Sequence, residues 1–279
     1  MEVQFVKLNP TQNMTILVES PIERERYPEI AGYLMRYESL HAEQTGFIER
    51  PAPQDSAAWA RLQMAGGEFC GNATMGLATY LAWLKNTPDG TRVLVPLEVS
   101  GANELVECSV CPDGGAFFCT LRMPTPEKIV DIVLPVNGAE ENFTAVVLPG
   151  ITHVIVPVAR FGLDPRTMAE SVVQEWGMRI CADAFGIILF DEEACRIDPL
   201  VSVKPLSGAG VSLVWERGCG SGSAAVGAYL AAKGRGNLIS QVSQPGGILE
   251  VEARWKDETF SLLSITGTVR LVARGVAYI

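Results

Sequence analysis

Residues 68–82, EFCGNATMGLATYLA, and residues 215–231, WERGCGSGSAAVGAYLA, each place a cysteine among small residues just before an apolar run. These cysteines, Cys70 and Cys219, lie 149 positions apart. The same offset also pairs Gly71 with Gly220, Tyr80 with Tyr229, Leu81 with Leu230 and Ala82 with Ala231. At nearly this offset, SGANELVE (100–107) is answered by PGGILEVE (245–252). Because both sets of matches occur in the same order along the sequence, they predict that the chain consists of two similar halves.

The apolar patterning predicts an α+β fold. In LEVSGANELVECSV (97–110), two alternating runs flank a Gly-Ala-Asn turn, which is typical of paired strands. The apolar run from Met75 to Leu84 is long enough for a helix, and its many Gly and Ala residues indicate close burial. Strand patterns begin again after residue 124, with a helix predicted in DPRTMAESVVQEWG (164–177) and another after Cys219.

Composition restricts the partners of the chain. Hydrophobic residues make up 48% of the 279 positions and charged residues 19%, which permits a substantial core. The net charge of −10 argues against nucleic acid or an anionic membrane surface as a partner. No apolar run reaches the roughly 18 residues of a membrane span. The first residues, MEVQFVKLNP, do not resemble a signal peptide, so we expect a cytoplasmic protein.

The seven cysteines favour reduced thiols over a disulfide framework, because an extracellular framework normally uses an even number in a shorter chain. Cys108 and Cys111 form a C-x-x-C, but no second such pair follows at zinc spacing. The only histidines are His41 and His153. We therefore expect no metal site and interpret the C-x-x-C as incidental.

A cysteine at a helix N-terminus lies near unpaired backbone N–H groups and the positive end of the helix dipole, which favour its thiolate. The small residues that follow, Gly71-Asn72 and Gly220-Ser221, let their N–H groups approach an anion such as a carboxylate. Two such thiols on one ligand could remove a proton from one face of a carbon and return one to the other. The alternative is two buried cysteines that act only as small hydrophobic residues in Gly-rich turns.

FCGNATM and WERGCGSGS resemble the signature motifs of diaminopimelate epimerase and its cofactor-independent amino-acid racemase relatives, and the similarity covers the whole chain. The resemblance implies two pseudo-symmetric domains, each a mixed or antiparallel sheet wrapped around a central helix. The first would span residues 1–123, completed by a C-terminal strand at 265–279, and the second residues 124–264. It further implies a small amino-acid substrate and no pyridoxal phosphate, and it allows a homodimer.

Carried over by position, the resemblance makes Cys70 and Cys219 the acid/base pair. The backbone of Gly71, Asn72, Gly220 and Ser221 would hold the substrate carboxylate. Glu216 and the carbonyl of Arg217 would hold its ammonium group, while Asn13 and Gln44 would line the pocket. For Glu216 and Arg217, the alternative is a surface ion pair at the end of a strand.

The departures from the family pattern bear on the substrate. Diaminopimelate epimerases grip the distal end of their substrate with further asparagines. Where the family has Asn-Pro-His, this chain has Ile151, Thr152 and His153. Where the family has an asparagine before Gly-Phe, this chain has Ala184, and Arg61 replaces another asparagine. Buried polar groups left unpaired cost about 1–3 kcal/mol each, which argues against diaminopimelate.

Stretches including NPTQNMTILV, EQTGFIE, FDEE and QPGG instead resemble the histidine racemases of staphylopine-type, opine-like metallophore biosynthesis. Glu43 is then the candidate acceptor for an imidazole N–H. Its alternative role is that of a solvated loop carboxylate.

Competing hypotheses remain at this stage. Diaminopimelate or another amino acid could be the substrate of the same chemistry. A carbon–carbon double-bond isomerase of the same fold superfamily generally lacks the paired cysteines, so their presence counts against it. A thiol redox sensor is the non-enzymatic alternative, because two facing low-pKa cysteines could form a disulfide.

Overall fold

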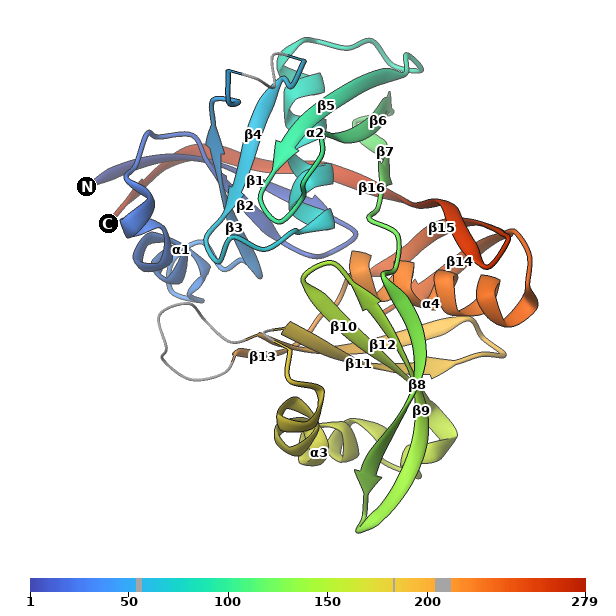
Figure 1. The fold of residues 1–279 in the computed structure, drawn as a ribbon. Coiled ribbons are helices and arrows are strands. Elements are labelled where there is room, and N and C mark those ends of the chain that lie inside the picture. The colour runs from blue at the N-terminus through green and yellow to red at the C-terminus, as the bar shows by residue number, and fades with distance from the viewer. Residues whose placement is uncertain (54–56, 183, 204–211) are drawn as a thin grey trace. The chain divides into compact units, whose positions relative to one another are not determined.

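The computed structural model describes residues 1–53, 57–182, 184–203 and 212–279. The chain divides into two compact units, one of Met1–Met123 with Ser264–Ile279 and one of Pro124–Leu263 (Figure 1). None of the helices in the described part of the chain is long and apolar enough to cross a membrane.

The first unit is a closed ring of eight strands. The order runs β1-β2-β3-β4-β5-β6-β7-β16, and β1 also pairs with β16, so the described strands of this unit form a closed ring. The β2–β3 and β4–β5 pairs are parallel, which makes the sheet mixed. The strands are β1 (Glu2–Pro10), β2 (Thr15–Val18), β3 (Gln44–Glu49), β4 (Ala60–Met64), β5 (Val93–Val99), β6 (Val106–Asp113), β7 (Ala116–Arg122) and β16 (Thr259–Tyr278).

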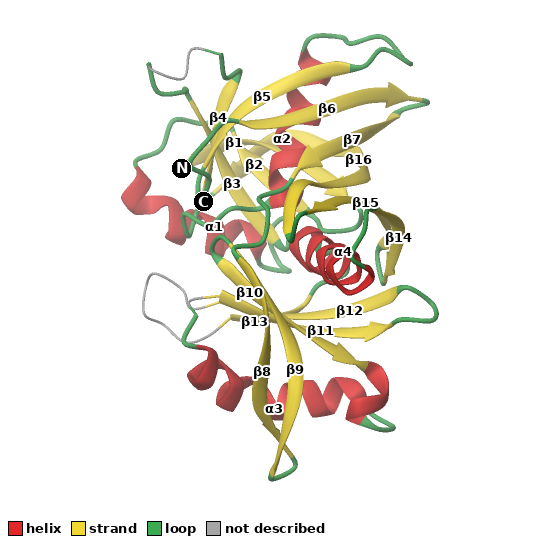
Figure 2. Cartoon of the chain, turned by 45° about the vertical axis from the view of Figure 1, so that its right-hand side comes forward, coloured by secondary structure: helices red, strands yellow, loops and turns green. Residues whose placement is uncertain are grey.

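Helix α2 (Gly71–Leu84) contacts every strand from β1 to β7. Most of its side chains are buried, and Figure 2 shows it framed by those strands. Its small residues permit such close contact on all sides. A short turn η1 (Arg24–Arg26) leads into α1 (Tyr27–Met35), which packs on β3 through Tyr27, Ile30, Ala31 and Leu34.

The second unit, in its described residues, also has a path of eight strands, β16-β15-β14-β12-β11-β10-β9-β8, and β13 pairs with β12 off this path. The β10–β11 and β12–β14 pairs are parallel. Its strands are β8 (Lys128–Val136), β9 (Ala139–Leu148), β10 (Ile151–Pro157), β11 (Ala184–Asp191), β12 (Arg196–Val203), β13 (Ser212–Trp215), β14 (Leu238–Gln244) and β15 (Gly247–Lys256). The sequence predicts an α+β fold, and the described residues form a mixed, sheet-rich fold with few helices.

Two helices pack on the sheet of the second unit. Helix α4 (Gly220–Gly234) contacts β9, β10, β12, β14 and β15. Helix α3 (Pro165–Ile180), preceded by η2 (Val158–Phe161), contacts β8, β11 and β12. Its buried Trp176 packs with Phe143 and Phe161 and donates its indole N–H to the Pro135 carbonyl at 2.8 Å. That aromatic cluster fixes α3 against its sheet.

Candidate active site

Cys70 is the N-cap of α2. Its φ and ψ of −127° and 108° are extended, and its Sγ accepts the backbone N–H of Ala73 at 3.3 Å. The hydroxyl of Thr74 donates to the Cys70 carbonyl at 2.7 Å. A cysteine here replaces the hydroxyl or carboxylate that usually caps a helix. The sulfur therefore lies among the first free N–H groups of α2.

Cys219 caps α4 in the same way. Its φ and ψ are −112° and 105°, and its Sγ accepts the N–H of Gly222 at 3.3 Å. The Ser223 hydroxyl donates to the Cys219 carbonyl at 2.8 Å. Both sulfurs are buried, at 9% exposure for Cys70 and 1% for Cys219, and both are free thiols. The repeated sequence thus produces two helix tips with matching hydrogen bonds.

In the first unit, the other predicted residues gather beside Cys70. The Cys70 thiol donates to Oε1 of Gln44, the first residue of β3. The preceding residue, Glu43, accepts the side-chain N–H of Asn13 at 3.1 Å. Asn13 is fully buried, whereas Glu43 is partly exposed. Gly71 and the buried Asn72 form the first turn of α2 behind the sulfur.

In the second unit, Cys219 lies beside Glu216. The Cys219 thiol donates a hydrogen bond to the Glu216 carboxyl. Burial raises the pKa of Glu216 to about 7, although part of the residue is reachable by solvent. Burial, and next the charge of Glu216, raises the pKa of Cys219, while the Ser221 hydroxyl 3.7 Å from its Sγ lowers it. The negative charge of Glu216 therefore favours the protonated thiol of Cys219.

Arg217 contributes through its backbone. Its carbonyl accepts the N–H of Gly246 at 2.6 Å, and its exposed guanidinium donates to the Pro245 carbonyl at 3.3 Å. A carbonyl oxygen has two lone pairs, so the Arg217 oxygen can accept a second donor. Gly220 and Ser221 form the first turn of α4 directly after Cys219.

Two residues beside Cys219 were not among the predicted site residues. Gln244 accepts the Cys219 backbone N–H at 2.7 Å, and Nε2 of His153 lies 2.9 Å from the Ser221 hydroxyl oxygen. Gln244 opens the QPGG motif, and His153 ends the stretch 151–153 that stands where the family has Asn-Pro-His, so both stood in singled-out stretches. The missing information was spatial, because 68 residues separate His153 from Ser221.

Arg61 and Cys108, also noted in the sequence, have structural partners. Arg61 in β4 forms salt bridges to Glu98 and, at 3.3 Å, to Glu49. Cys108 hydrogen-bonds the buried Cys119 on the neighbouring strand rather than Cys111. Among the described residues, no group of His, Cys, Asp or Glu has an arrangement that could hold a metal ion.

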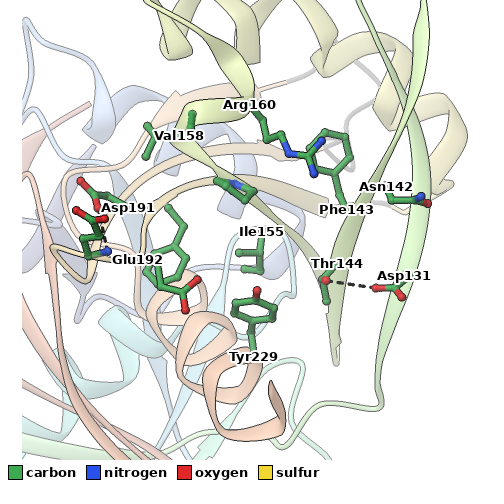
Figure 3. A pocket seen from close by; sticks show the side chains of 14 residues that line it. Asp131, Asn142, Phe143, Thr144, Ile155, Val158, Arg160, Asp191, Glu192 and Tyr229 are labelled. Carbon is green, nitrogen blue, oxygen red and sulfur yellow. Dashed lines mark hydrogen bonds between the residues drawn. The ribbon is translucent and has the colours of Figure 1, made fainter. Parts of the chain in front are cut away.

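A separate hollow of about 560 Å³ lies within the second unit, lined by β8–β11, η2 and Tyr229 of α4 (Figure 3). The FDEE motif (190–193) forms part of its wall. Asp191 accepts the N–H groups of Glu193 and Ala194, both at 3.1 Å, which closes the turn after β11. Because Tyr229 stands ten residues after Cys219, this hollow is about 15 Å along α4 from the cysteine.

Comparison with known proteins gives full-length similarity. A family model described as "Histidine racemase CntK N-terminal domain" matches residues 2–278. A histidine racemase of Staphylococcus aureus strain Mu50 is 30% identical over 279 residues, covering 99% of this chain and 98% of that protein. A histidine racemase of Fusobacterium nucleatum subsp. nucleatum is 32% identical over 284 residues, covering 99% and 97%.

Solved structures share the fold at low identity. A hydroxyproline epimerase from Agrobacterium vitis, with bound trans-4-hydroxy-L-proline, has a TM-score of 0.72 at 14% identity over 99% of this chain and 92% of that one. A protein from Pseudomonas aeruginosa described as a predicted epimerase has a TM-score of 0.62 at 14% identity, covering 98% of each chain. A methylitaconate-delta-isomerase has a TM-score of 0.60 at 12% identity, covering 100% and 96%.

Proposed function

The chain belongs to the histidine racemase family, and from this premise we propose that it interconverts L- and D-histidine with Cys70 and Cys219 as its acid/base pair. Family membership makes the protein an isomerase, an amino-acid racemase. The identity of the amino acid, the roles of the cysteines and the fate of the product belong to the proposal. The observation that carries it is the matched geometry of the two cysteine caps.

The proposed reaction needs two thiols in opposite protonation states. The thiolate on one face of the substrate takes the α-proton, which leaves a planar carbanion whose charge spreads onto the carboxylate. The thiol on the other face then gives its proton to the same carbon. The product is the opposite enantiomer, and the two cysteines have exchanged protonation states.

The backbone N–H groups of Gly71, Asn72, Gly220 and Ser221 would stabilise the negative charge that the carboxylate gains. They lie in the first turns of α2 and α4, where unpaired N–H groups and helix dipoles favour anions. Glu216 and the Arg217 carbonyl would hold the ammonium group. Because the two thiols and this cradle balance every proton, we propose that no pyridoxal phosphate takes part.

The preference for histidine is assigned to Glu43. The Glu43 carboxylate accepts a hydrogen bond from the Asn13 amide. Glu43 directly precedes Gln44, whose side chain accepts a hydrogen bond from the Cys70 thiol. This places an oriented acceptor near the reacting sulfur, suited to an imidazole N–H. We further propose that the two units are pseudo-symmetric halves, each a sheet around its cysteine-capped helix. We also propose that the enzyme is a homodimer. The D-histidine that it forms would be incorporated into an opine-type metallophore.

Exchange of the α-proton in D₂O tests the proposal. Extensively dialysed protein should remove the α-proton signal of L-histidine faster than that of the other L-amino acids, or of diaminopimelate, and should show no Schiff-base absorbance. Cys70→Ala and Cys219→Ala should each abolish racemisation, because one face of the carbanion then lacks a proton donor. Near-normal racemisation in both variants, or activity only after adding pyridoxal phosphate, would contradict the mechanism.

Serine at each cysteine position refines this test. A serine hydroxyl keeps the hydrogen bonding of the thiol but is a far weaker acid, so its ionised form is scarcely populated. We therefore expect serine to fail as the proton acceptor more than as the proton donor. Cys70→Ser should lose exchange mainly with one enantiomer and Cys219→Ser mainly with the other. Equal losses with both enantiomers would show that the thiols do not divide the two faces between them.

A further inference from the structure

Two hairpin turns lie against the residues that precede the two cysteines, and the proposed reaction gives these turns no role. The first joins β5 to β6 at residues 100–105, and the second joins β14 to β15 at residues 245–246. They begin the second repeated match of the sequence, SGANELVE (100–107) and PGGILEVE (245–252). The repeat therefore covers both the cysteine caps and the turns beside them.

In the first unit, the hairpin turn holds the backbone carbonyl two residues before Cys70. The hydroxyl of the buried Ser100 donates to the Glu68 carbonyl at 2.8 Å. The next residue, Gly101, has a φ of 75°, and a Cβ there would collide with the backbone nitrogen of Phe69. Backbone atoms cannot turn away as a side chain can, so only glycine allows the turn to approach this closely.

In the second unit, the hairpin turn holds the carbonyl at the same place, two residues before Cys219. The Gly246 N–H donates to the Arg217 carbonyl at 2.6 Å. Gly246 is the residue that the sequence repeat pairs with Gly101. Gln244, the last residue of β14, adds a second contact, because its Oε1 accepts the backbone N–H of Cys219 at 2.7 Å. Each unit thus anchors the chain where it enters its cysteine-capped helix.

The first turns of the two helices do not supply such an anchor themselves. In a capping box, the side chain three residues after the cap returns a hydrogen bond to the backbone N–H of the cap. That position holds Ala73 in α2 and Gly222 in α4, and neither has a polar side chain. The small residues that leave room for a substrate carboxylate therefore also remove the local means of fixing the cap.

Stability alone does not account for Gln244. Its side chain is 6% exposed, and its Nε2 has no hydrogen-bond partner among the residues that the structure describes. A buried amide nitrogen without a partner costs free energy, which an apolar side chain of similar size would avoid. The amide oxygen binds the N–H of Cys219, so the benefit of this glutamine lies at the cysteine.

We propose that Ser100 and Gln244 are positioning residues, which fix the two cysteine caps from the hairpin turns of their own units. Ser100 acts on Cys70 through the carbonyl two residues before it, and Gln244 acts on Cys219 through its backbone N–H. A thiol that shifts away from its face of the substrate transfers protons more slowly, even where the substrate still binds. The inference rests on the proposed acid/base roles of the two cysteines.

Gln244→Met tests the anchor of Cys219, because methionine keeps the size of the side chain and loses the acceptor. We expect kcat for histidine to fall about tenfold with KM nearly unchanged. The free energy of unfolding in urea should change little, since the variant removes one unpaired buried group and creates another. As the control, Asn237→Leu removes an amide oxygen that accepts the Trp255 N–H at 3.0 Å at the far end of the same two strands, and kcat should stay unchanged. An unchanged kcat in Gln244→Met overturns the role of this residue.

Ser100→Ala tests the anchor of Cys70. It also removes the acceptor of the Met64 N–H, so both stability and kcat should fall. As the control, Thr87→Ala removes a hydroxyl that donates to the Ala82 carbonyl at 2.9 Å, at the opposite end of α2. This variant should lower stability without lowering kcat. Equal kcat values in Ser100→Ala and Thr87→Ala would mean that Ser100 has no effect on the cysteine beyond stability.

The enantiomer that each variant affects separates the positioning role from the racemase mechanism. Gln244→Met should slow α-proton exchange mainly with the enantiomer that Cys219→Ser affects, since only that enantiomer loses its proton to the displaced sulfur. Ser100→Ala should follow Cys70→Ser in the same way. The opposite assignment, with the two serine variants still divided, overturns the positioning role and leaves the mechanism intact.

Hydrogen exchange of the Cys219 backbone amide, followed by NMR, tests the anchor without any need for activity. The amide should exchange faster in Gln244→Met than in Asn237→Leu, because only the first variant removes its acceptor. If the serine variants do not divide the enantiomers, the mechanism fails and this measurement still decides the anchor. Equal exchange rates in the two variants would overturn it.

Discussion

Glu43 and Glu216 are the two carboxyl groups beside the cysteine caps, and each has a different partner. Glu43 accepts from the buried amide of Asn13, whereas Glu216 accepts from the Cys219 thiol. An amide donor orients a carboxylate without competing for a proton. The charge of Glu216 raises the pKa of the Cys219 thiol, whereas Glu43 is oriented as an acceptor by the Asn13 amide.

Glu43→Gln should raise the KM for histidine about fivefold and leave the KM for alanine nearly unchanged. The amide keeps an acceptor oxygen but loses the charge, and charge-assisted hydrogen bonds exceed neutral ones by about 1 kcal/mol. Steady-state kinetics with both amino acids provide the measurement. Glu38→Gln removes the same charge at an exposed position and should alter neither value. Equal increases for histidine and alanine would mean that Glu43 does not contact the imidazole.

The unfolding free energy of the Glu216→Gln variant, relative to that of the natural protein, should increase as the pH rises from about 4.5 to about 7. The folded carboxyl has a pKa of about 7 against an ordinary value of 4.5, so the folded state binds more protons in this window. The natural protein therefore loses stability as pH rises through it, and the glutamine variant lacks this loss. Urea denaturation at several pH values gives the difference in unfolding free energy. A difference that does not change with pH would contradict the raised pKa.

At the scale of the element, the two capped helices use glycine in different ways. A Cβ on Gly76 of α2 would have Leu8 as its nearest neighbour, at 3.8 Å, which is ordinary contact. A Cβ on Gly227 of α4 would lie 2.3 Å from Cγ1 of the buried Val251 in β15. Valine is stiff about χ1, so it cannot easily turn away. Gly227 thus sets how closely α4 approaches its sheet.

The same substitution should consequently have opposite effects at these positions. Gly76→Ala should stabilise the protein by about 0.5–1 kcal/mol, because alanine loses less backbone entropy in a helix. Gly227→Ala should destabilise it by about 1–3 kcal/mol through overpacking against Val251. Chemical denaturation of the matched pair provides the check. Stabilisation by both would show that β15 yields to the added methyl group.

Helices and strands could be predicted where neighbouring residues in the sequence carry a clear pattern. Both small-residue helices follow their cysteines as expected. Helix α1 was not predicted, although its buried residues 27, 30, 31 and 34 follow a helical period, because Pro28 and Gly32 interrupt the apolar pattern. The contact of His153 with Ser221 could not be predicted, since strand periodicity identifies no distant partner.

At the scale of the whole molecule, each unit supplies one cysteine cap, so the proposed reaction needs both units. If one chain provides both thiols, mixing the Cys70→Ala and Cys219→Ala variants should restore no activity, even after unfolding and refolding them together. If each site takes its thiols from two different chains, co-refolding should restore a substantial fraction of activity. Racemisation of histidine by the refolded mixture, compared with each variant alone, distinguishes the two arrangements.

Strand β16 gives the chain an unusual order of completion. Its residues 259–263 belong to the second unit, and residues 264–279 close the ring of the first by pairing with both β7 and β1, from Pro10 opposite Val269 to Glu2 opposite Tyr278. As the ribosome releases the chain from its amino end, residues 1–123 emerge first and yet lack their last strand. The second unit has all of its residues as soon as Leu263 has been released, before the last strand of the first unit has emerged. The half of the protein that is synthesised first is therefore the half that must wait for residues 264–279 in order to finish folding.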